Sequence, residues 1–302
     1  MEQLEQCPCC HSKQLKPDGV VSDFFLTNES FHLSKCADCG FVFTNPRPDI
    51  TEIGKYYQTE NYISHHSSNT SFFHRLYRLI RDYMFGKKMN YIRVYFKKPW
   101  QKVSLMDYGA ASGDFLAYCK SQNIEKTIGI EQDASCRKAA DEIHGIQLQT
   151  PEELSLLPQN SLDVITLWHV LEHIHNADEV ISMFHKVLNE EGVLVIAVPN
   201  INSLDRKIYS NYWAAYDVPR HIYHFNTATI SVLLKRLGFT LAGKHALPFD
   251  AYYISLHSEW LKKSNSFISI LRAVKNGFLS NWSARKTGEY SSLVYVFKKT
   301  KK

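Results

Sequence analysis

The sequence predicts an α/β fold in which a parallel sheet carries helices on both faces. From Lys102 onward, short apolar segments alternate with segments of helical periodicity, as in successive strand–helix–strand units. A glycine-rich turn follows the first apolar segment, where such folds bind ligands. Two pairs of cysteines precede this region and predict a small separate module.

Seven segments have the composition of strands, at residues 103–109, 126–131, 145–149, 162–168, 192–199, 239–247 and 291–299. Three segments between them have helical periodicity, at residues 114–122, 135–143 and 177–189. A helical insertion is expected between the last two strands, at about residues 250–288. We therefore assign residues 102–302 to one α/β domain.

The composition limits the functions to consider. The chain has 302 residues and 44% hydrophobic residues, enough for a sizeable core. No apolar run reaches the ~18 residues of a membrane span, and the first residues do not resemble a signal peptide, so we expect a cytoplasmic protein. The net charge of +5 is weak support for nucleic-acid binding, because four lysines lie in the last five residues.

The cysteine spacing predicts a metal site. Seven cysteines without a secretory signal argue against a disulfide framework. Two C-x2-C pairs, 25 residues apart, could complete the tetrahedral shell of a structural zinc ion through Cys7, Cys10, Cys36 and Cys39. Cys9 leaves the first pair ambiguous, although Cys7 with Cys10 fits best. Residues 1–48 are thus expected to form a zinc ribbon, the alternative being four unpaired thiols.

Residues 49–101 are expected to form a basic helical connector or cap. Between Phe72 and Lys102 there are nine Lys and Arg residues and one acid. The periodicity predicts two helices separated at Gly86, the first with one apolar face formed by Phe72, Leu76, Ile80 and Tyr83. The charges could bind a phosphate, a diphosphate or an RNA backbone. We favour the alternative, in which both helices cover the next domain and their charges face water.

The turn "LMDYGAASGDF" at residues 105–115 does not suit a phosphate. A nucleotide triphosphate loop requires Lys and Ser or Thr after its last glycine, whereas Asp114 follows Gly113. The dinucleotide fingerprint requires a glycine where Ala111 stands. The spacing suits a ligand with an amino acid end. Glu131 ends the second predicted strand, where a carboxylate can accept both ribose hydroxyls.

Four segments together resemble the class I S-adenosylmethionine-dependent methyltransferases: "LMDYGAASGDF", "IGIEQD", "LPQNSLDVITLWHVLEHI" and "LNEEGVLVIAVPN". The group with a V-L-E-H block after the fourth strand is the most similar, and "DVPRHIYHFNTATISVLLKRLGF" resembles its later segment. The resemblance covers Lys102–Leu247 and, more loosely, the final strand. It implies a Rossmann-like, seven-stranded methyltransferase sheet.

The resemblance also implies S-adenosylmethionine as cofactor and a role for particular residues. The implied contacts are Asp107, Gly109, Ala111 and Gly113 around the methionine end, Glu131 on the ribose, Thr150 beside the adenine, and Trp168 and His169 near the sulfonium. The sequence departs from the pattern at Ala111, often a third glycine, and at Thr150 with its preceding Gln149, where many members carry an acid. Each residue has a structural alternative as a loop brace, a solvated strand end or core.

The "HVLEH" block allows three interpretations. H-x-x-E-H is an inverted zinc-protease pattern, but its place just after a parallel strand argues against a protease. Some methyltransferases hold a divalent ion with a similar E-x-x-E-H block, in which His169 here replaces the first acid. We favour the third interpretation, in which Glu172 and His173 hydrogen-bond to neighbouring helix ends and hold the loop.

The "PRHIYHF" segment supplies a candidate general base. Methyl transfer requires a positioned acceptor and removal of its proton, which a neutral imidazole can perform near neutral pH. His221 is our first catalytic candidate and His169 the second, and the alternative for His221 is a structural loop histidine. Arg220 could bind an anionic substrate.

These features favour an S-adenosylmethionine-dependent methyltransferase acting on a small-molecule, nucleotide-sugar or glycan-precursor acceptor. Similar enzymes of surface-polysaccharide and deoxysugar pathways can carry a cysteine-rich zinc module. The first alternative is an rRNA base methyltransferase that reads RNA with its ribbon; the second is a catalytically inactive zinc-ribbon interaction protein. The basic amphipathic insertion could contact a membrane surface, although we favour a helical lid or covering. The sequence leaves the oligomeric state open.

Overall fold

Two sheets organise the chain in the computed structural model, which describes residues 1–57, 72–95, 98–262 and 267–301, with only the backbone for residues 72–80. The larger sheet contains, in spatial order, β5 (Lys126–Ile130), β4 (Ser104–Tyr108), β6 (Leu162–Trp168), β7 (Leu188–Pro199), β10 (Ser292–Lys299) and β9 (Phe239–Ala246). The smaller sheet contains β1 (Leu15–Ser22), β2 (Ser30–Cys36), β3 (Val42–Thr44) and β8 (Tyr223–His224).

The α-helices of the described chain are α2 (Phe72–Arg93), α3 (Asp114–Ser121), α4 (Ala134–His144), α5 (Ala177–Val187), α6 (Leu204–Tyr209), α7 (Thr227–Arg236), α8 (Pro248–Leu261) and α9 (Phe267–Thr287). Short 3-10 helices are η1 (Ile53–Tyr56), η3 (Trp100–Lys102), η4 (Pro151–Leu156), η5 (Leu171–His173), η6 (Ser210–Tyr212) and η7 (Ala214–Tyr216). Within the described residues, no helix combines the length and the hydropathy required to cross a membrane.

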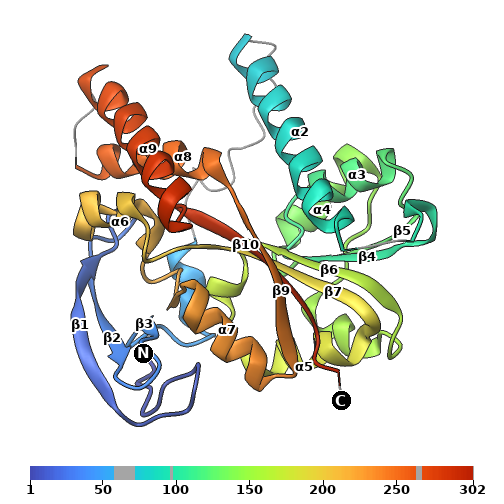
Figure 1. Cartoon of the computed structure of the whole chain (residues 1–302), viewed down its shortest axis with the longest axis horizontal. Helices are drawn as coiled ribbons and strands as arrows, with labels where there is room; N and C mark the ends of the chain where they lie inside the picture. The colour runs from blue at the N-terminus through green and yellow to red at the C-terminus, as the bar shows by residue number, and fades with distance from the viewer. Residues whose placement is uncertain (58–71, 96–97, 263–266, 302) are drawn as a thin grey trace.

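The predicted α/β class with helices flanking the sheet is confirmed. Figure 1 shows the larger sheet at the centre, with α3 and α4 at one end of the molecule and the smaller sheet at the other. Strands β4 to β7 are parallel, but β10 is antiparallel to both β7 and β9. The prediction of a parallel sheet therefore holds for β4 to β7, whereas β10, next to the edge strand β9, runs in the opposite direction.

The strand expected at residues 145–149 is reduced to a single bridge. Gln149 forms a parallel bridge with Ile130. Its N–H donates to the Gly129 carbonyl and its carbonyl accepts from the Glu131 N–H. Gly145 ends α4 in the left-handed conformation, and Pro151 begins η4. Gly145 and Pro151 therefore leave only a short segment between the two helices, and proline cannot donate a hydrogen bond to a neighbouring strand. The described sheet therefore has six strands rather than seven.

The two helices expected around Gly86 are one continuous helix, α2. A Cβ at Gly86 would lie 3.2 Å from the Tyr118 hydroxyl, so this glycine permits close helix packing rather than a break. The buried face is formed by Phe85, Met89 and Ile92, whereas Tyr83 is exposed, contrary to prediction. The other side chains of the predicted face, at residues 72, 76 and 80, lie outside the described residues.

The smaller sheet joins the N-terminal segment to a distant part of the chain. β3 pairs with β8, which lies almost 180 residues later. Phe41 packs against Tyr223 and Phe225, with ring centroids 5.7 and 5.2 Å apart. A module of this size has too little apolar surface for a separate core, and it shares the core of the larger domain. The expected boundaries after residues 48 and 101 remain predictions.

Arg220 links the two parts through a buried ion network. Its side chain is 1% exposed and donates to Asp23 Oδ1 at 2.9 Å, Asp217 Oδ1 at 2.6 Å and the Tyr56 carbonyl at 3.0 Å. Asp23 is equally buried and accepts hydrogen bonds from the backbone of the following turn. The guanidinium is thus committed to structural partners, which corrects its expected role in binding an anionic substrate.

Replacing this guanidinium should destabilise the whole chain. Arg220→Met leaves the buried Asp23 carboxylate without its cation, and we expect a loss of about 3–5 kcal/mol in the free energy of unfolding. Urea unfolding would measure it. The control is Lys138→Met, which removes an exposed pair with Glu142 and should cost at most about 0.5 kcal/mol. Equal losses in the two variants would contradict this account.

Candidate active site

The glycine-rich turn packs tightly against the segment that follows β6. Gly109 and Gly113 have φ angles of +78° and +74°, in the left-handed region. A Cβ at Gly109 would lie 2.4 Å from Cγ2 of Val170. No larger residue fits there without movement, so the turn and the V-L-E-H block are brought into direct contact at the carboxyl edge of the sheet.

Asp107 reaches this edge as a buried carboxylate. It is 3% exposed, and the Thr166 hydroxyl donates to it at 2.6 Å. Burial raises its pKa to about 7, while the Thr166 hydrogen bond and the charge of Lys88 act in the opposite direction. A carboxyl group in this environment would ionise more readily beside a bound cation.

Lys88 of α2 brings a cation to the same edge. Its ammonium nitrogen lies 4.3 Å from the centroid of the Trp168 ring. Burial lowers the pKa of Lys88 to about 8, against the opposing effects of Asp107 and Asp250. The sequence did not single out Lys88, because it is one of many basic residues in its segment and belongs to no motif.

Glu131 connects the glycine-rich turn to the end of β5. Its carboxylate accepts hydrogen bonds from the backbone N–H groups of Ala111 at 2.8 Å and Asp133 at 2.9 Å. Ala111 holds a left-handed φ of +47°, which aims its N–H at that carboxylate. Thr150 follows the bridge between Gln149 and β5 and therefore lies beside Glu131. The structure thus brings Glu131, Thr150 and the turn together at one edge.

Trp168 and His169 end β6 at that edge. The Trp168 ring meets Phe115 edge-on at 5.5 Å, and its buried Nε1 has no hydrogen-bond acceptor among the described residues. His169 lies between Asp250, 3.1 Å from Nε2, and Glu172, 3.5 Å from Nδ1. Burial disfavours the charged ring, but the two carboxylates raise its pKa to about 10. His169 is therefore an imidazolium at neutral pH, unsuited to accept a proton.

His173 and His221 lie beside the buried carboxylate of Glu172. Glu172 is fully buried, and neither of its side-chain oxygens has a hydrogen-bond donor within the described chain. Nδ1 of His173 lies 3.0 Å from the Arg220 carbonyl, and Nδ1 of His221 lies 2.9 Å from the Ala215 carbonyl. Because a carbonyl only accepts, Nδ1 of His221 donates its hydrogen to Ala215, whereas Nδ1 of His173 also lies 3.0 Å from the Tyr57 hydroxyl.

The Glu172 carboxylate has His169 3.5 Å away, and its cluster with His173 and His221 could hold a further cation. One ligand atom from each of Glu172, His173 and His221 lies within 4.8 Å of the others. A proton shared with His221 or a divalent ion would each complete it, since two imidazoles and a carboxylate are a common ligand set. Burial and the nearby His221 lower the pKa of His173 to about 4, so its ring stays neutral. We expected the side chains of Glu172 and His173 to hold the loop through hydrogen bonds. His173 makes such a bond, with the Arg220 carbonyl, but the Glu172 carboxylate makes none within the described chain.

The four predicted cysteines also lie together. The Cys7 and Cys39 sulfurs are 3.6 Å apart, as are those of Cys10 and Cys36, close to the ~3.8 Å edge of a tetrahedral zinc–thiolate site. Cys9 is not part of this group, and its thiol donates to the Thr229 carbonyl at 3.2 Å. The donor set fits a closed structural zinc site formed by Cys7, Cys10, Cys36 and Cys39.

The cysteine geometry predicts which thiols bind metal. We expect one zinc ion per chain at this group, lost in Cys10→Ser but kept in Cys9→Ser, whose side chain lies outside the cluster. Elemental analysis of the purified variants would measure the zinc content. Equal loss of zinc in the two variants would mean that the first pair has the other register.

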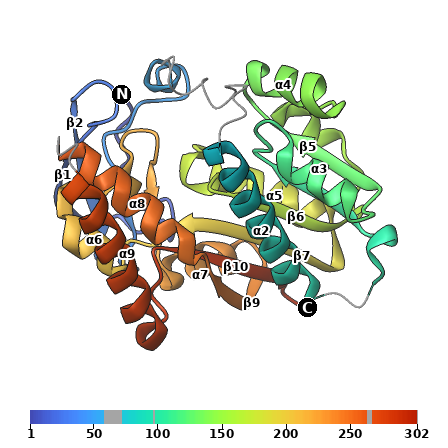
Figure 2. The same ribbon diagram turned by 90° about the horizontal axis from the view of Figure 1, so that it is seen from above.

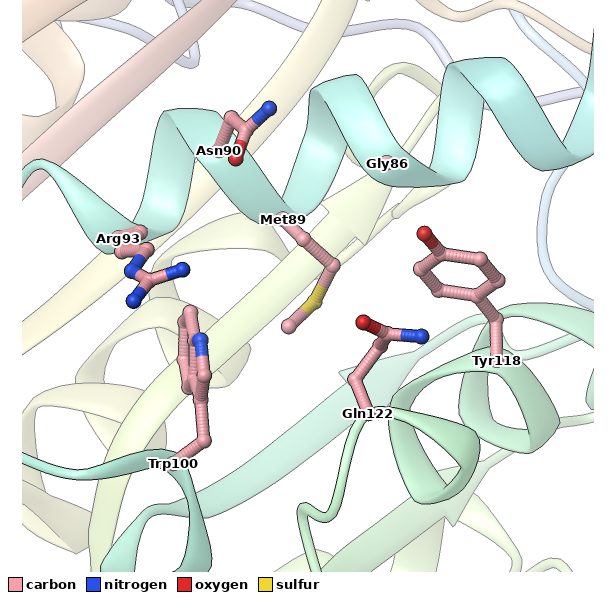
Figure 3. Close-up of a pocket in the computed structure, with 7 residues that line it drawn as sticks. All are labelled: Gly86, Met89, Asn90, Arg93, Trp100, Tyr118 and Gln122. Carbon is pink, nitrogen blue, oxygen red and sulfur yellow. The ribbon is translucent and has the colours of Figure 1, made fainter.

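A cavity of about 160 Å³ lies between α2 and α3, apart from these residues. Figure 3 shows its lining side chains, which are Gly86, Met89, Asn90, Arg93, Trp100, Tyr118 and Gln122. None of the candidate site residues lines it, and it is smaller than the roughly 300 Å³ of typical small-molecule sites. The candidate site is therefore the sheet edge rather than this cavity.

Comparisons with known proteins identify the family. A model described as a methyltransferase domain matches residues 74–243. A search of curated protein sequences found no match. A structure described as a sarcosine dimethylglycine methyltransferase from Galdieria sulphuraria has a TM-score of 0.50 at 15% identity, covering 74% of this chain and 86% of that one. A SAM-dependent methyltransferase from Archaeoglobus fulgidus has a TM-score of 0.48 at 20% identity, covering 76% of this chain and 100% of that one.

Since the family model matches more than half of the sequence, the chain belongs to the methyltransferase domain family and is an S-adenosylmethionine-dependent methyltransferase by family and fold.

Proposed function

We propose that the chain transfers a methyl group from S-adenosylmethionine to a hydroxyl of a nucleotide-sugar or another glycan-precursor acceptor. The observation that carries this proposal is the meeting of a buried carboxylate, Asp107, and an aromatic face, Trp168, at one sheet edge, to which His221 is linked through Glu172 and His169. The bound cofactor would supply an electrophilic methyl group with a good leaving group. The chain must supply binding, orientation and a route for the acceptor proton.

The residues at the edge fit such a cofactor. Asp107 is a buried carboxylate with one side-chain donor and could bind an ammonium group. Glu131 could accept ribose hydroxyls, and Thr150, which lies beside it, could contact the adenine. The face of Trp168 already receives the Lys88 ammonium at 4.3 Å, so it could receive a sulfonium in the same way. Gly109 and Gly113 let the turn pack closely against Val170 and Ala140, which would hold it in place for the cofactor.

His221 is the proposed general base. Its Nδ1–H is held by the Ala215 carbonyl, so Nε2, which lies 3.9 Å from Asp217 Oδ2, would be the atom that takes the acceptor proton. The Glu172 carboxylate would stabilise the imidazolium that forms, as a buried carboxylate does beside a catalytic histidine. His169 would keep its positive charge and hold Asp250 and Glu172 in place.

The acceptor class rests on charge. His169 is paired with Asp250 and Glu172, so Lys88, over the Trp168 ring, is the cation that would contact the diphosphate of an acceptor. Apart from its lysine-rich end the chain is nearly neutral, which favours one such group over a long nucleic-acid track. Binding to RNA through the N-terminal cysteine module and a purely interacting role are the two alternatives.

Cofactor binding should depend on the Asp107 charge. The Asp107 carboxyl ionises as pH rises through about 7, and Lys88 loses its competing charge near pH 8. Both changes favour a cationic ligand, so affinity for S-adenosylmethionine should increase from pH 6 to pH 8. Asp107→Asn should bind about tenfold to hundredfold more weakly and lose much of this pH dependence.

Isothermal titration calorimetry at several pH values would measure these affinities. Asp141→Asn, an exposed acid on α4, is the matched control and should behave as the unmodified chain. An affinity that falls with rising pH, or an Asp107→Asn variant that binds normally, would exclude this binding mode.

The acceptor can be found with radiolabelled S-adenosylmethionine and a fractionated cell extract. We expect label in the nucleotide-sugar or lipid-glycan fraction. His221→Gln should lower kcat by a factor of about 10²–10⁴ and leave cofactor affinity within about twofold. His245→Gln is the control, because that ring contacts Tyr91 and Tyr95 away from the V-L-E-H block. Label in RNA would overturn the proposed acceptor, and absence of cofactor binding would favour the interacting role.

A further inference from the structure

Helix α9 packs on the protein with its small residues. The buried side of this 21-residue helix contains Ser269, Ala273, Gly277, Ser280 and Ala284. A Cβ at Gly277 would lie 2.7 Å from the Tyr252 ring of α8, so the two helices approach closely. Ser280 donates to the buried Asp205 at 2.7 Å, which fixes the rotation of α9.

The opposite side of α9 exposes large apolar side chains. Their exposed fractions range from 38% for Leu279 to 74% for Phe267, and the set is Phe267, Ile268, Ile270, Leu271, Val274, Phe278, Leu279 and Trp282. At about 100° per residue these side chains share one arc, which faces away from the small residues. They are eight of the 22 exposed large hydrophobic side chains of the described chain. Such a concentration marks an interaction surface rather than the scattered apolar residues of an ordinary surface.

Positive charge accompanies this apolar arc, with Arg272 at its edge and Lys275, Arg285 and Lys286 within it. Arg272, Lys275, Arg285 and Lys286 are all exposed, and α9 contains no acidic residue. Lys262, at the end of α8, adds a further exposed base. Figures 1 and 2 show α8 and α9 side by side at the end of the molecule that carries the smaller sheet, away from α3 and α4.

We propose that the exposed face of α9 binds the surface of an anionic membrane, with the helix lying in the plane of the headgroups. Aromatic and aliphatic side chains combined with Lys and Arg, whose long side chains can reach the headgroups, are a composition that suits such interfacial helices. A second copy of the chain is a poorer occupant, because two faces with bases and no acids would repel each other. Because Ser280 and the close packing at Gly277 fix the small-residue side inward, the apolar side already faces outward before any partner binds.

Vesicle co-sedimentation with the full chain tests this surface. We expect binding to vesicles of phosphatidylglycerol and phosphatidylcholine, and much weaker binding to pure phosphatidylcholine. The double variant Phe278→Ser, Trp282→Ser should lower the partition coefficient at least about tenfold, since both side chains would leave the acyl boundary. Arg272→Gln and Lys275→Gln should each lower it about fivefold on anionic vesicles and leave binding to neutral vesicles unchanged.

Matched controls lie at the other end of the molecule. The double variant Ile143→Ser, Leu156→Ser removes equally exposed apolar side chains, and Lys120→Gln, Lys126→Gln removes exposed charges. These controls should bind vesicles as the unmodified chain does. Circular dichroism would verify that each variant is folded, and the readout requires neither cofactor nor acceptor.

Two results would overturn the proposal. The first is a chain that stays in the supernatant with anionic vesicles, or one whose binding the α9 variants and the controls change alike. The second is a dimer, seen by sedimentation velocity, that Phe278→Ser, Trp282→Ser dissociates without any effect on vesicle binding. That outcome would assign the surface to a second copy of the chain.

Discussion

The buried charge of Arg220 is the constraint on which the rest of this structure depends. A guanidinium removed from water needs anionic partners, and it finds them in Asp23 of the N-terminal segment and Asp217 of its own loop. The next residue in the chain is His221, and β8 follows immediately and completes the smaller sheet. One ion network therefore fixes both the attachment of the N-terminal segment and the place of the proposed base.

The four-cysteine group lies close to the place where the N-terminal segment pairs with β8. Cys36 ends β2, and Cys39 lies in the turn that leads to β3, the strand that pairs with β8. Phe41 and Phe43 extend from this turn into the shared core. A zinc ion at these thiols would stiffen β3 and, through β8, the segment that carries His221. Its contribution to function would thus be mechanical, at a distance from the reacting atoms.

The candidate site is built around unsatisfied negative and lone-pair groups. Asp107 is a carboxylate with little hydrogen bonding, and Glu172 is one without any donor in the described chain. Each group is costly to bury alone and becomes favourable beside a cation. Lys88 and His169 are the cations present, and both lie within reach of the site. In the proposed function, Asp107 would bind a cationic ligand, and Glu172 with His221 would accept a proton. The basic apolar face of α9 would hold the chain at the surface of an anionic membrane, so that methyl transfer would take place there.

The sequence by itself determined the features that a few neighbouring residues encode. Periodicity predicted six of the strands, the glycine spacing predicted the turn after Asp107, and the cysteine spacing identified the thiols that meet. The tertiary structure decided what depends on distant partners. It reduced residues 145–149 to a bridge, ran α2 through Gly86, and turned β10 antiparallel. It also brought Asp250 and Lys88 to the site, placed Glu172 beside His221, and committed Arg220 to Asp23. Local spacing fixes backbone conformation within a turn or two, whereas burial, charge state and tautomer are set by groups that the folded chain brings together from far along its length.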